Sequence, residues 1–263
     1  MVRFYYVVVC FMVMTSILIG ILWCLEKLRL PGRRWLGAYY FKLLSGLLRV
    51  RVKVVGTPLT GKPVLVLSNH MSWADIPSIG SIMPLVFISK SEVRKWPFVG
   101  PAAVLLHTIF VDRSRRQKTA EVNATIANKM ESGDPVVLFA EGTSSDGNRV
   151  LQFRSALVGA VSEVMTQNTE TVWLQPIAIS YPRIDGLPMG RLHRPRVAWY
   201  GDTDFVPHLK DFLTHGAVDA IVTFGEPVAF DGGDRKTLVK SLETTVRRMR
   251  IEALRGDFSA KAA

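Results

Sequence analysis

The sequence predicts an α/β protein with a mixed, largely parallel sheet flanked by helices, preceded by an N-terminal membrane-anchoring helix. Three observations support this fold class. The chain starts with a long uncharged apolar run, and after residue 51 short apolar segments alternate with amphipathic ones. Hydrophobic residues make up 48% of the 263 residues and charged residues 21%, a balance that excludes a disordered chain. The two cysteines, Cys10 and Cys24, are too few for a disulfide framework.

The apolar run covers residues 4–25, which contain no charge. As a helix, these residues would span about 33 Å, enough to cross the hydrocarbon core of a bilayer. A cleaved signal peptide is the first alternative, but its apolar region is usually about 7–15 residues long and ends at small residues. Here the run is longer and continues into Leu-Trp-Cys-Leu-Glu-Lys. We therefore expect an uncleaved anchor, with a buried core helix as the second alternative.

Most of the net positive charge lies in the first 53 residues, mainly just after this run. The first 53 residues hold nine Lys and Arg against one acid, whereas the remaining 210 residues hold 24 basic and 21 acidic groups. A nucleic-acid-binding protein more often spreads its basic residues over a face of the fold, so the sequence predicts no nucleic-acid partner. The positions of Lys27, Arg29, Arg33 and Arg34 favour an anionic membrane surface and keep the rest of the chain in the cytoplasm.

Residues 35–50 form a second apolar and aromatic segment. Trp35, Tyr39 and Tyr40 suit the headgroup level of a bilayer, so this segment reads as a helix lying in the interface. An ordinary core helix of the globular part is the alternative. The simplest partition has an anchor and interfacial helix in residues 1–50, a catalytic domain in residues 51–257 and a tail in residues 258–263.

The elements of the globular part follow from short apolar runs and from helical periodicity. Thr119, Val122, Ile126 and Met130 recur at helical spacing, and Gly133 ends that helix. The expected strands cover residues 52–55, 64–67, 85–89, 108–111, 136–139, 172–179, 197–200 and 220–224. The expected helices cover residues 73–82, 98–106, 116–131, 153–164, 209–214 and 235–254.

The stretch Ser-Asn-His-Met-Ser-Trp-Ala-Asp directly follows the strand expected at residues 64–67. His70 thus lies at the carboxyl end of a strand, where α/β sheets place reactive groups. Asp75 is five residues later, close enough to fold back onto the imidazole if the chain turns into a helix. A carboxylate in that position fixes the tautomer and stabilises the imidazolium. Alone, the spacing His-x4-Asp is common by chance.

Two more stretches follow strands. Glu141, Gly142 and Thr143 begin a turn rich in glycine and hydroxyl groups, which reads as a binding loop or as a plain surface turn. Arg113 belongs to a basic cluster between a strand and a helix, typical of an anion site or of a solvated turn. The other four histidines lie in contexts that suggest no chemistry, and one histidine with scattered carboxylates predicts no metal site.

Together and in this order, these stretches resemble the lysophosphatidic acid acyltransferase family of glycerolipid acyltransferases. Asn69, His70 and Asp75 match its N-H-x4-D block in full, and residues 110–113 and 139–145 match its F-I-x-R and F-P-E-G-T-R-S blocks. Residues 175–179 are similar to its apolar strand with proline. The resemblance covers roughly residues 52–228, and four ordered blocks are far more specific than any one.

Two positions depart from the family pattern. Ala140 replaces a proline, and Ser144 replaces an arginine thought to hold the acceptor's phosphate in the family. Either Arg149 or Arg154 compensates, or the acceptor lacks a glycerol phosphate. Trp199-Tyr-Gly-Asp and Pro207-His-Leu look like the bacterial subgroup that acylates lyso-ornithine lipid. The resemblance therefore implies lyso-ornithine lipid as acceptor, with lysophosphatidate as the alternative.

The resemblance implies an enzyme at the cytoplasmic membrane of a bacterium. His70 would act as general base on the acceptor hydroxyl, with Asp75 orienting it. Arg113, Glu141, Gly142 and Thr143 would bind substrate. The acyl donor would be a thioester of acyl carrier protein or coenzyme A, with no cofactor or metal. A non-catalytic protein that binds anionic lipid is the rival from another class: it explains the anchor but not the ordered blocks.

Overall fold

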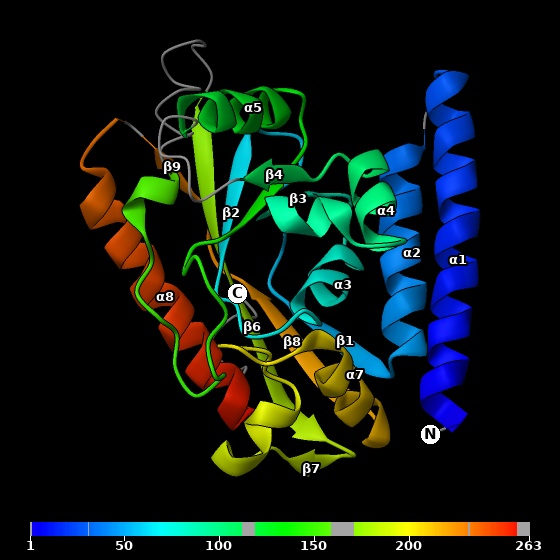
Figure 1. Ribbon diagram of the computed structural model, residues 1–263. Coiled ribbons are helices and arrows are strands. Elements are labelled where there is room, and N and C mark those ends of the chain that lie inside the picture. The colour runs from blue at the N-terminus through cyan, green and yellow to red at the C-terminus, as the bar shows by residue number, and fades with distance from the viewer. Residues whose placement is uncertain (1, 31, 112–118, 159–170, 231, 257–263) are drawn as a thin grey trace.

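The computed structural model describes residues 2–30, 32–111, 119–158, 171–230 and 232–256. A nine-stranded sheet runs through the middle of these residues, with strands in the order β1-β8-β6-β2-β5-β3-β4 (Figure 1). Every neighbouring pair along that path is parallel except β6 and β8, and the short strands β7 and β9 pair antiparallel with β6. The expected mixed, largely parallel α/β sheet is confirmed.

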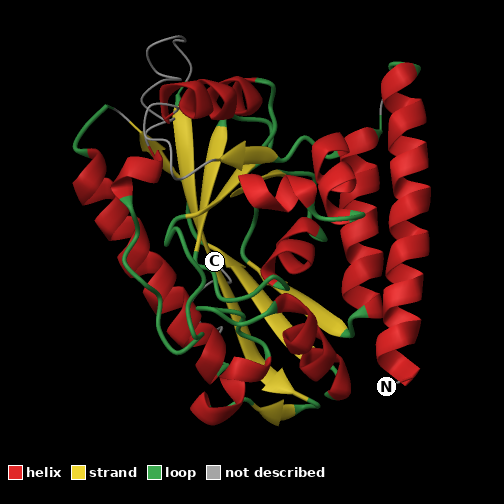
Figure 2. Ribbon diagram, viewed as in Figure 1, coloured by secondary structure: helices red, strands yellow, loops and turns green. Residues whose placement is uncertain are grey.

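The elements alternate along most of the chain (Figure 2). The strands are β1 (Val50–Val55), β2 (Val64–Ser68), β3 (Val86–Lys90), β4 (Ile109–Val111), β5 (Val136–Phe139), β6 (Val172–Ile184), β7 (Leu187–Pro188), β8 (Val218–Phe224) and β9 (Val228–Phe230). The α-helices are α1 (Val2–Lys27), α2 (Arg33–Leu47), α3 (Asp75–Gly80), α4 (Val99–Leu105), α5 (Thr119–Glu131), α7 (Phe205–Thr214) and α8 (Arg235–Arg255). Short 3₁₀ helices are η1 (Ser91–Lys95), η3 (Ser155–Val158) and η4 (Arg191–Arg196).

Helices cover both faces of the sheet, and the central strand β2 shows why. All five of its residues are buried, and they alternate between the two cores. Leu65 and Leu67 pack in the core formed with α5 and α8, whereas Val64 and Val66 pack in the core formed with α3 and α7. A strand that is buried on both faces has a continuous run of apolar residues, and this run predicted the strand at residues 64–67.

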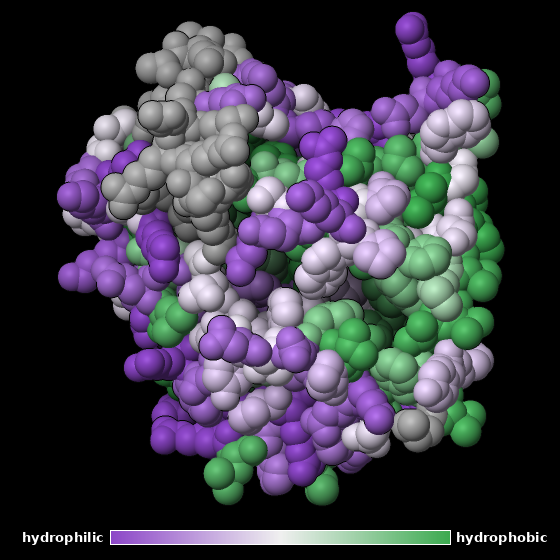
Figure 3. Space-filling view, viewed as in Figure 1, coloured by the Kyte–Doolittle hydropathy of each residue, from purple (hydrophilic) through white to green (hydrophobic). Residues whose placement is uncertain are grey.

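The N-terminal helices α1 and α2 pack side by side against one flank of the domain (Figure 1). Along α1, Val7, Leu18 and Leu22 are buried, and the Arg3 guanidinium donates to the carbonyls of Leu213 in the last turn of α7 and of His215 just after it. The outward side of this pair carries exposed apolar and aromatic residues: Tyr5, Tyr6, Val9, Val13, Ile17, Ile21, Trp23, Trp35, Tyr39 and Leu43. Figure 3 shows this hydrophobic flank over α1. By length and composition, α1 is also the one helix among the described residues that could cross a membrane.

Most of the elements expected from the sequence form within a few residues of their expected bounds. One expectation is wrong. Residues 197–200 are not a strand, because they follow η4, and the Trp199 N–H donates to Met71 O (2.7 Å) instead of to a strand partner. The helix expected at residues 73–82 starts only at Asp75, because the preceding backbone turns around that carboxylate. Of the helix expected at residues 153–164, the described part is the 3₁₀ helix η3, and residues 159–164 lie outside the described residues.

Candidate active site

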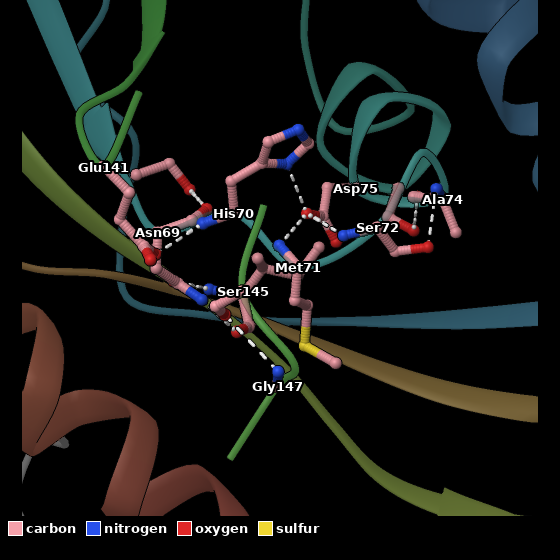
Figure 4. Close-up of polar contacts among 12 residues, drawn as sticks. Asn69, His70, Met71, Ser72, Ala74, Asp75, Glu141, Ser145 and Gly147 are labelled. Atoms are coloured by element: carbon pink, nitrogen blue, oxygen red, sulfur yellow. Dashed lines mark hydrogen bonds and ion pairs between the residues drawn. The ribbon is translucent and has the colours of Figure 1, made fainter. Parts of the chain in front are cut away.

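Three adjacent strands bring the site residues to one edge of the sheet. In the parallel register, Ser68 at the end of β2 pairs with Phe139 at the end of β5 and with Ile177 of β6. His70 follows β2 by two residues, and Glu141 follows β5 by two residues. Their backbones therefore emerge side by side, and the His70 N–H donates to Glu141 Oε1 (2.8 Å). Figure 4 shows both residues at this edge.

The His70 ring is paired with the carboxylate expected from the spacing. His70 Nδ1 lies 2.8 Å from Asp75 Oδ2. The side chain of Asp75 is fully buried, whereas that of His70 is 19% exposed. With Nδ1–H donated to the carboxylate, Nε2 carries the free lone pair. The pair thus leaves a proton-accepting nitrogen on a ring that solvent or a substrate can reach.

The turn around Asp75 explains its position. Asp75 Oδ2 also accepts from the backbone N–H groups of Met71 (2.8 Å) and Ser72 (2.9 Å), so the loop folds over the carboxylate (Figure 4). The other oxygen, Oδ1, accepts from the Tyr181 hydroxyl (2.8 Å). Tyr181 is buried on β6, and burial, followed by the charge of Asp75, raises its pKa. It therefore remains a neutral donor. The sequence reasoning missed Tyr181.

Two further contacts hold His70 in place. Asn69 bridges to β6: its Nδ2 donates to Ile179 O (3.0 Å), and its Oδ1 accepts from the Ile179 N–H (2.8 Å). The imidazole stacks on the Phe139 ring, with centroids 4.0 Å apart. The asparagine of the first block thus anchors the loop to the sheet, and the phenylalanine of the third block supports the imidazole face.

Glu141 is a buried acid that organises the loops. Its Oε1 accepts from the His70 N–H and its Oε2 from the Leu151 N–H (both 2.8 Å). The side chain is almost inaccessible, and burial raises its pKa to about 7, against the lowering effect of these two hydrogen bonds. Because both oxygens are engaged with backbone, Glu141 ties the loop after β5 to the loop after β2.

The rest of the expected binding turn lies beside this acid. Gly142 is buried with a φ of 73°, which favours glycine, and Thr143 is exposed. The Ser145 N–H donates to His70 O (2.9 Å), so the turn closes back on the loop of residues 69–74 (the proposed catalytic loop). A methyl group added to Gly142 would meet Arg154 Cδ and Nε at 3.1 Å. The Arg154 side chain therefore lies directly over the turn that carries Ser144.

Helix α8 supports the same loop from behind, which the sequence reasoning also missed. The buried Arg250 guanidinium donates to Gly147 O, and Glu243 Oε2 accepts from the Phe153 N–H (2.8 Å). Burial lowers the pKa of Arg250 to about 10, so it stays charged at neutral pH. No periodic signal marks Arg250 in the sequence, because it lies on the buried stripe of α8 among apolar residues.

The remaining sequence predictions fall elsewhere. Arg113 lies outside the described residues. His107 lies beside Lys129 and Arg33, and His208 is buried behind Trp73. Across residues 2–30, 32–111, 119–158, 171–230 and 232–256, no group of three or more His, Cys, Asp or Glu is arranged to hold a metal ion.

Known proteins share both the blocks and the fold. A family model described as acyltransferase matches residues 50–180. The chain is 42% identical over 257 residues to the lyso-ornithine lipid O-acyltransferase of Brucella abortus, covering 97% of this chain and 96% of the relative. It is 41% identical to the enzyme of the same name from Rhizobium meliloti, covering 87% and 79%.

The chain belongs to the acyltransferase family. A 1-acyl-sn-glycerol-3-phosphate acyltransferase of Neisseria gonorrhoeae is 34% identical, but over only 39% of this chain and 41% of the relative. The crystal structure of the 1-acyl-sn-glycerophosphate acyltransferase of Thermotoga maritima superposes with a TM-score of 0.64 at 22% identity, covering 97% of this chain and 94% of that one. That likeness shows the acyltransferase fold, with helices and a largely parallel sheet in the same arrangement.

Proposed function

We propose that this acyltransferase moves a fatty acyl group from a thioester to the hydroxyl of a lysolipid, and that the acceptor is lyso-ornithine lipid. The observation that carries the proposal is the 2.8 Å contact between His70 Nδ1 and the buried Asp75 carboxylate. It leaves Nε2 as a base on a partly exposed ring. A base of this kind suits proton abstraction from an alcohol, a step worth roughly 10²–10⁴ in rate.

The reaction needs no covalent enzyme intermediate. His70 Nε2 takes the proton of the acceptor hydroxyl as its oxygen attacks the thioester carbonyl. The carbon–sulfur bond then breaks, and the thiolate receives the proton back from the imidazolium. The Asp75 carboxylate stabilises the cationic ring during transfer and keeps it in the correct tautomer. The donor is a thioester of acyl carrier protein or of coenzyme A.

The choice of acceptor rests on the relatives and on Ser144. Two relatives that match most of this chain are named as lyso-ornithine lipid O-acyltransferases. Ser144 stands where the family pattern has an arginine for a phosphate. An acceptor with a carboxylate in place of a glycerol phosphate needs less positive charge there. Arg154, which lies over Gly142, is placed to supply one guanidinium for that carboxylate.

The membrane supplies the acceptor and receives the product. The outward face of α1 and α2 is apolar and aromatic, while their inward face packs on the catalytic domain. We infer that this outward face enters the bilayer, with the basic residues after α1 on the cytoplasmic side. This arrangement keeps the site at the membrane surface.

The test compares two acceptors with purified protein in mixed micelles and acyl carrier protein thioester as donor. We expect product from lyso-ornithine lipid and little from lysophosphatidate. The Ser144→Arg variant should gain activity on lysophosphatidate without a matching gain on lyso-ornithine lipid. Preference of the wild-type protein for lysophosphatidate would contradict the proposed acceptor and leave the acyl-transfer chemistry intact.

A further inference from the structure

A cluster of four aromatic rings lies next to the catalytic loop. Trp73, Trp96, Trp199 and Phe205 make up this cluster, and Phe205 is at its centre. The Phe205 ring centroid lies 5.7 Å from Trp73, 5.5 Å from Trp96 and 5.9 Å from Trp199. All four side chains are half-buried, so each keeps part of its ring open at the surface.

The cluster begins at the catalytic residues. Trp73 lies three positions after His70, inside the loop that folds over Asp75. On the other side, the backbone N–H of Trp199 donates to the backbone carbonyl of Met71 (2.7 Å). A molecule lying along these rings therefore reaches the catalytic loop itself.

The indole N–H groups of two of these rings are hydrogen-bonded to other parts of the protein. Trp73 Nε1 donates to His208 Nδ1 (3.0 Å), and Trp199 Nε1 donates to Thr203 O (2.7 Å). His208 Nε2 then donates to Ala198 O (3.0 Å), and burial lowers the His208 pKa, which keeps the ring neutral. These bonds satisfy the indole N–H groups of Trp73 and Trp199 within the protein, so the open parts of these two rings are apolar.

At its far end, the cluster approaches the helices with the apolar outward face. Phe205 is the first residue of α7, and the next residue, Val206, is 60% exposed. Helix α7 contacts α1, and the Arg3 guanidinium of α1 donates to Leu213 O at the other end of α7. On the other side of the cluster, the Trp96 carbonyl accepts from the Gly100 N–H of α4 (2.9 Å), and α4 also contacts α1. The cluster is thus linked through α4 and α7 to the helix that carries the exposed apolar flank.

We propose that the aromatic cluster is the subsite for the acyl chain of the lysolipid acceptor, which makes Trp96, Trp199 and Phe205 determinants of acceptor specificity. This proposal rests on the function proposed above. A lysolipid comes from the bilayer, on the side where α4 and α7 contact α1, whereas the thioester is delivered by a water-soluble carrier. An alkyl chain that covers the open parts of these rings removes apolar surface from water, which is favourable.

This assignment explains what residues of the Trp-Tyr-Gly-Asp and Pro-His-Leu motifs do in the structure. Trp199 supplies a ring of the cluster, and His208 holds Trp73 in orientation from behind. His208 is a positioning residue, since its contacts are with Trp73 and Ala198. The two motifs therefore build the chain subsite, while His70 and Asp75 perform the chemistry common to the family.

The test is a steady-state comparison of the Phe205→Ala and Trp96→Ala variants with wild type, using lyso-ornithine lipids with long and short acyl chains. We expect the KM for the long-chain acceptor to rise roughly 10-fold, as loss of a partly covered ring implies. The KM for the short-chain acceptor and for the thioester should stay within about twofold, since neither uses the rings. Phe205→Leu should restore much of the affinity. Leu192→Ala is the matched control, because Leu192 is 91% exposed and outside the cluster.

Three outcomes would overturn the assignment. A rise in the KM for the thioester alone would show that the cluster binds the acyl chain of the donor. Equal effects on the KM for long-chain and short-chain acceptors would show that the cluster does not bind the acceptor's acyl chain. A fall in kcat that Phe205→Leu does not rescue would make the cluster structural only. If the wild-type protein prefers lysophosphatidate, the same series with that acceptor tests the cluster independently of the acceptor's headgroup.

Discussion

At the residue scale, the Asp75 carboxylate is held from three directions. His70 and the Met71 and Ser72 N–H groups share Oδ2, and the Tyr181 hydroxyl donates to Oδ1. A buried carboxylate without hydrogen-bond donors would pay the full cost of its lost hydration. Tyr181 thus holds one oxygen of the Asp75 carboxylate, although it lies more than 100 residues away in the sequence.

We expect Tyr181→Phe to lower both stability and kcat. The substitution leaves Asp75 Oδ1 buried without that donor, a loss of about 1–3 kcal/mol. The KM for the acceptor should change little, since Tyr181 is buried behind the pair. Thermal unfolding in detergent and steady-state kinetics measure the two effects. Tyr39→Phe, at a tyrosine that is 59% exposed, is the control. Unchanged kcat in Tyr181→Phe would contradict this role.

Glu141 gives a pH dependence of stability with a defined sign. Burial raises its pKa from 4.5 to about 7, so the folded protein holds the Glu141 proton more tightly than the unfolded chain. The stabilisation from that proton is full below pH 4.5 and is lost as the pH rises to about 7.

We therefore expect the stability of wild type relative to Glu141→Gln to fall by about 3 kcal/mol between these pH values. The glutamine cannot ionise, so other titrating groups cancel in the difference. Chemical unfolding of both proteins across the pH range measures it. A difference that is flat with pH, or that grows as pH rises, would show that Glu141 is not held as a raised-pKa acid.

At the element scale, α8 holds the loop of residues 140–154, where we propose that substrate binds. Arg250 and Glu243 contact the backbone at Gly147 and Phe153, on either side of the Glu141–Leu151 hydrogen bond. The loop is thus tied both to the loop that carries His70 and to a long helix. This explains how an irregular segment presents Gly142 and Thr143 in one conformation.

We expect Arg250→Met to loosen that loop. It removes a charged donor to a buried carbonyl, a cost of about 1–3 kcal/mol in stability, and it should raise the acceptor KM more than the thioester KM. Arg248→Met is the matched control, two residues away on the exposed side of the same helix. Equal effects of the two substitutions on the acceptor KM would argue against a role for α8 in the site.

Sequence reasoning succeeded where burial leaves a local pattern. Strands β2 and β5 are continuous apolar runs, so both strands could be predicted, with His70 and Glu141 each just after a strand end. It failed at residues 197–200, whose apolar pattern serves to cover the catalytic loop and not to extend the sheet. Tyr181 and Arg250 could not be predicted, because their roles depend on contacts across more than 100 residues.

At the scale of the whole molecule, the N-terminal helices are both part of the fold and the proposed membrane contact. Neighbouring positions of α1 separate the two roles: Ile17 is 57% exposed, whereas Leu18 is 3% exposed. Leu18 packs with Leu22, Tyr40 and Ala102 in a small core between α1, α2 and α4. An anchor that merely tethers the domain would not need this core.

We expect Ile17→Asp and Leu18→Ala to affect different properties. Ile17→Asp should reduce binding to lipid vesicles in a flotation assay, with little change in unfolding temperature in detergent, because it puts a charge on the outward face. Leu18→Ala should cost about 2–5 kcal/mol of stability through the cavity it leaves. Loss of stability in Ile17→Asp, without loss of vesicle binding, would place the outward face against protein instead of lipid.

The measurement that tests the account most directly is the initial rate of acyl transfer to lyso-ornithine lipid by His70→Ala, compared with wild type at equal folded concentration. The His70–Asp75 pair is the proposed source of general-base catalysis, so we expect the rate to fall by about 10²–10⁴. Binding of the acceptor should persist, because Glu141 and the aromatic cluster stay in place. Transfer by His70→Ala at a rate within a few-fold of wild type would contradict the proposed mechanism.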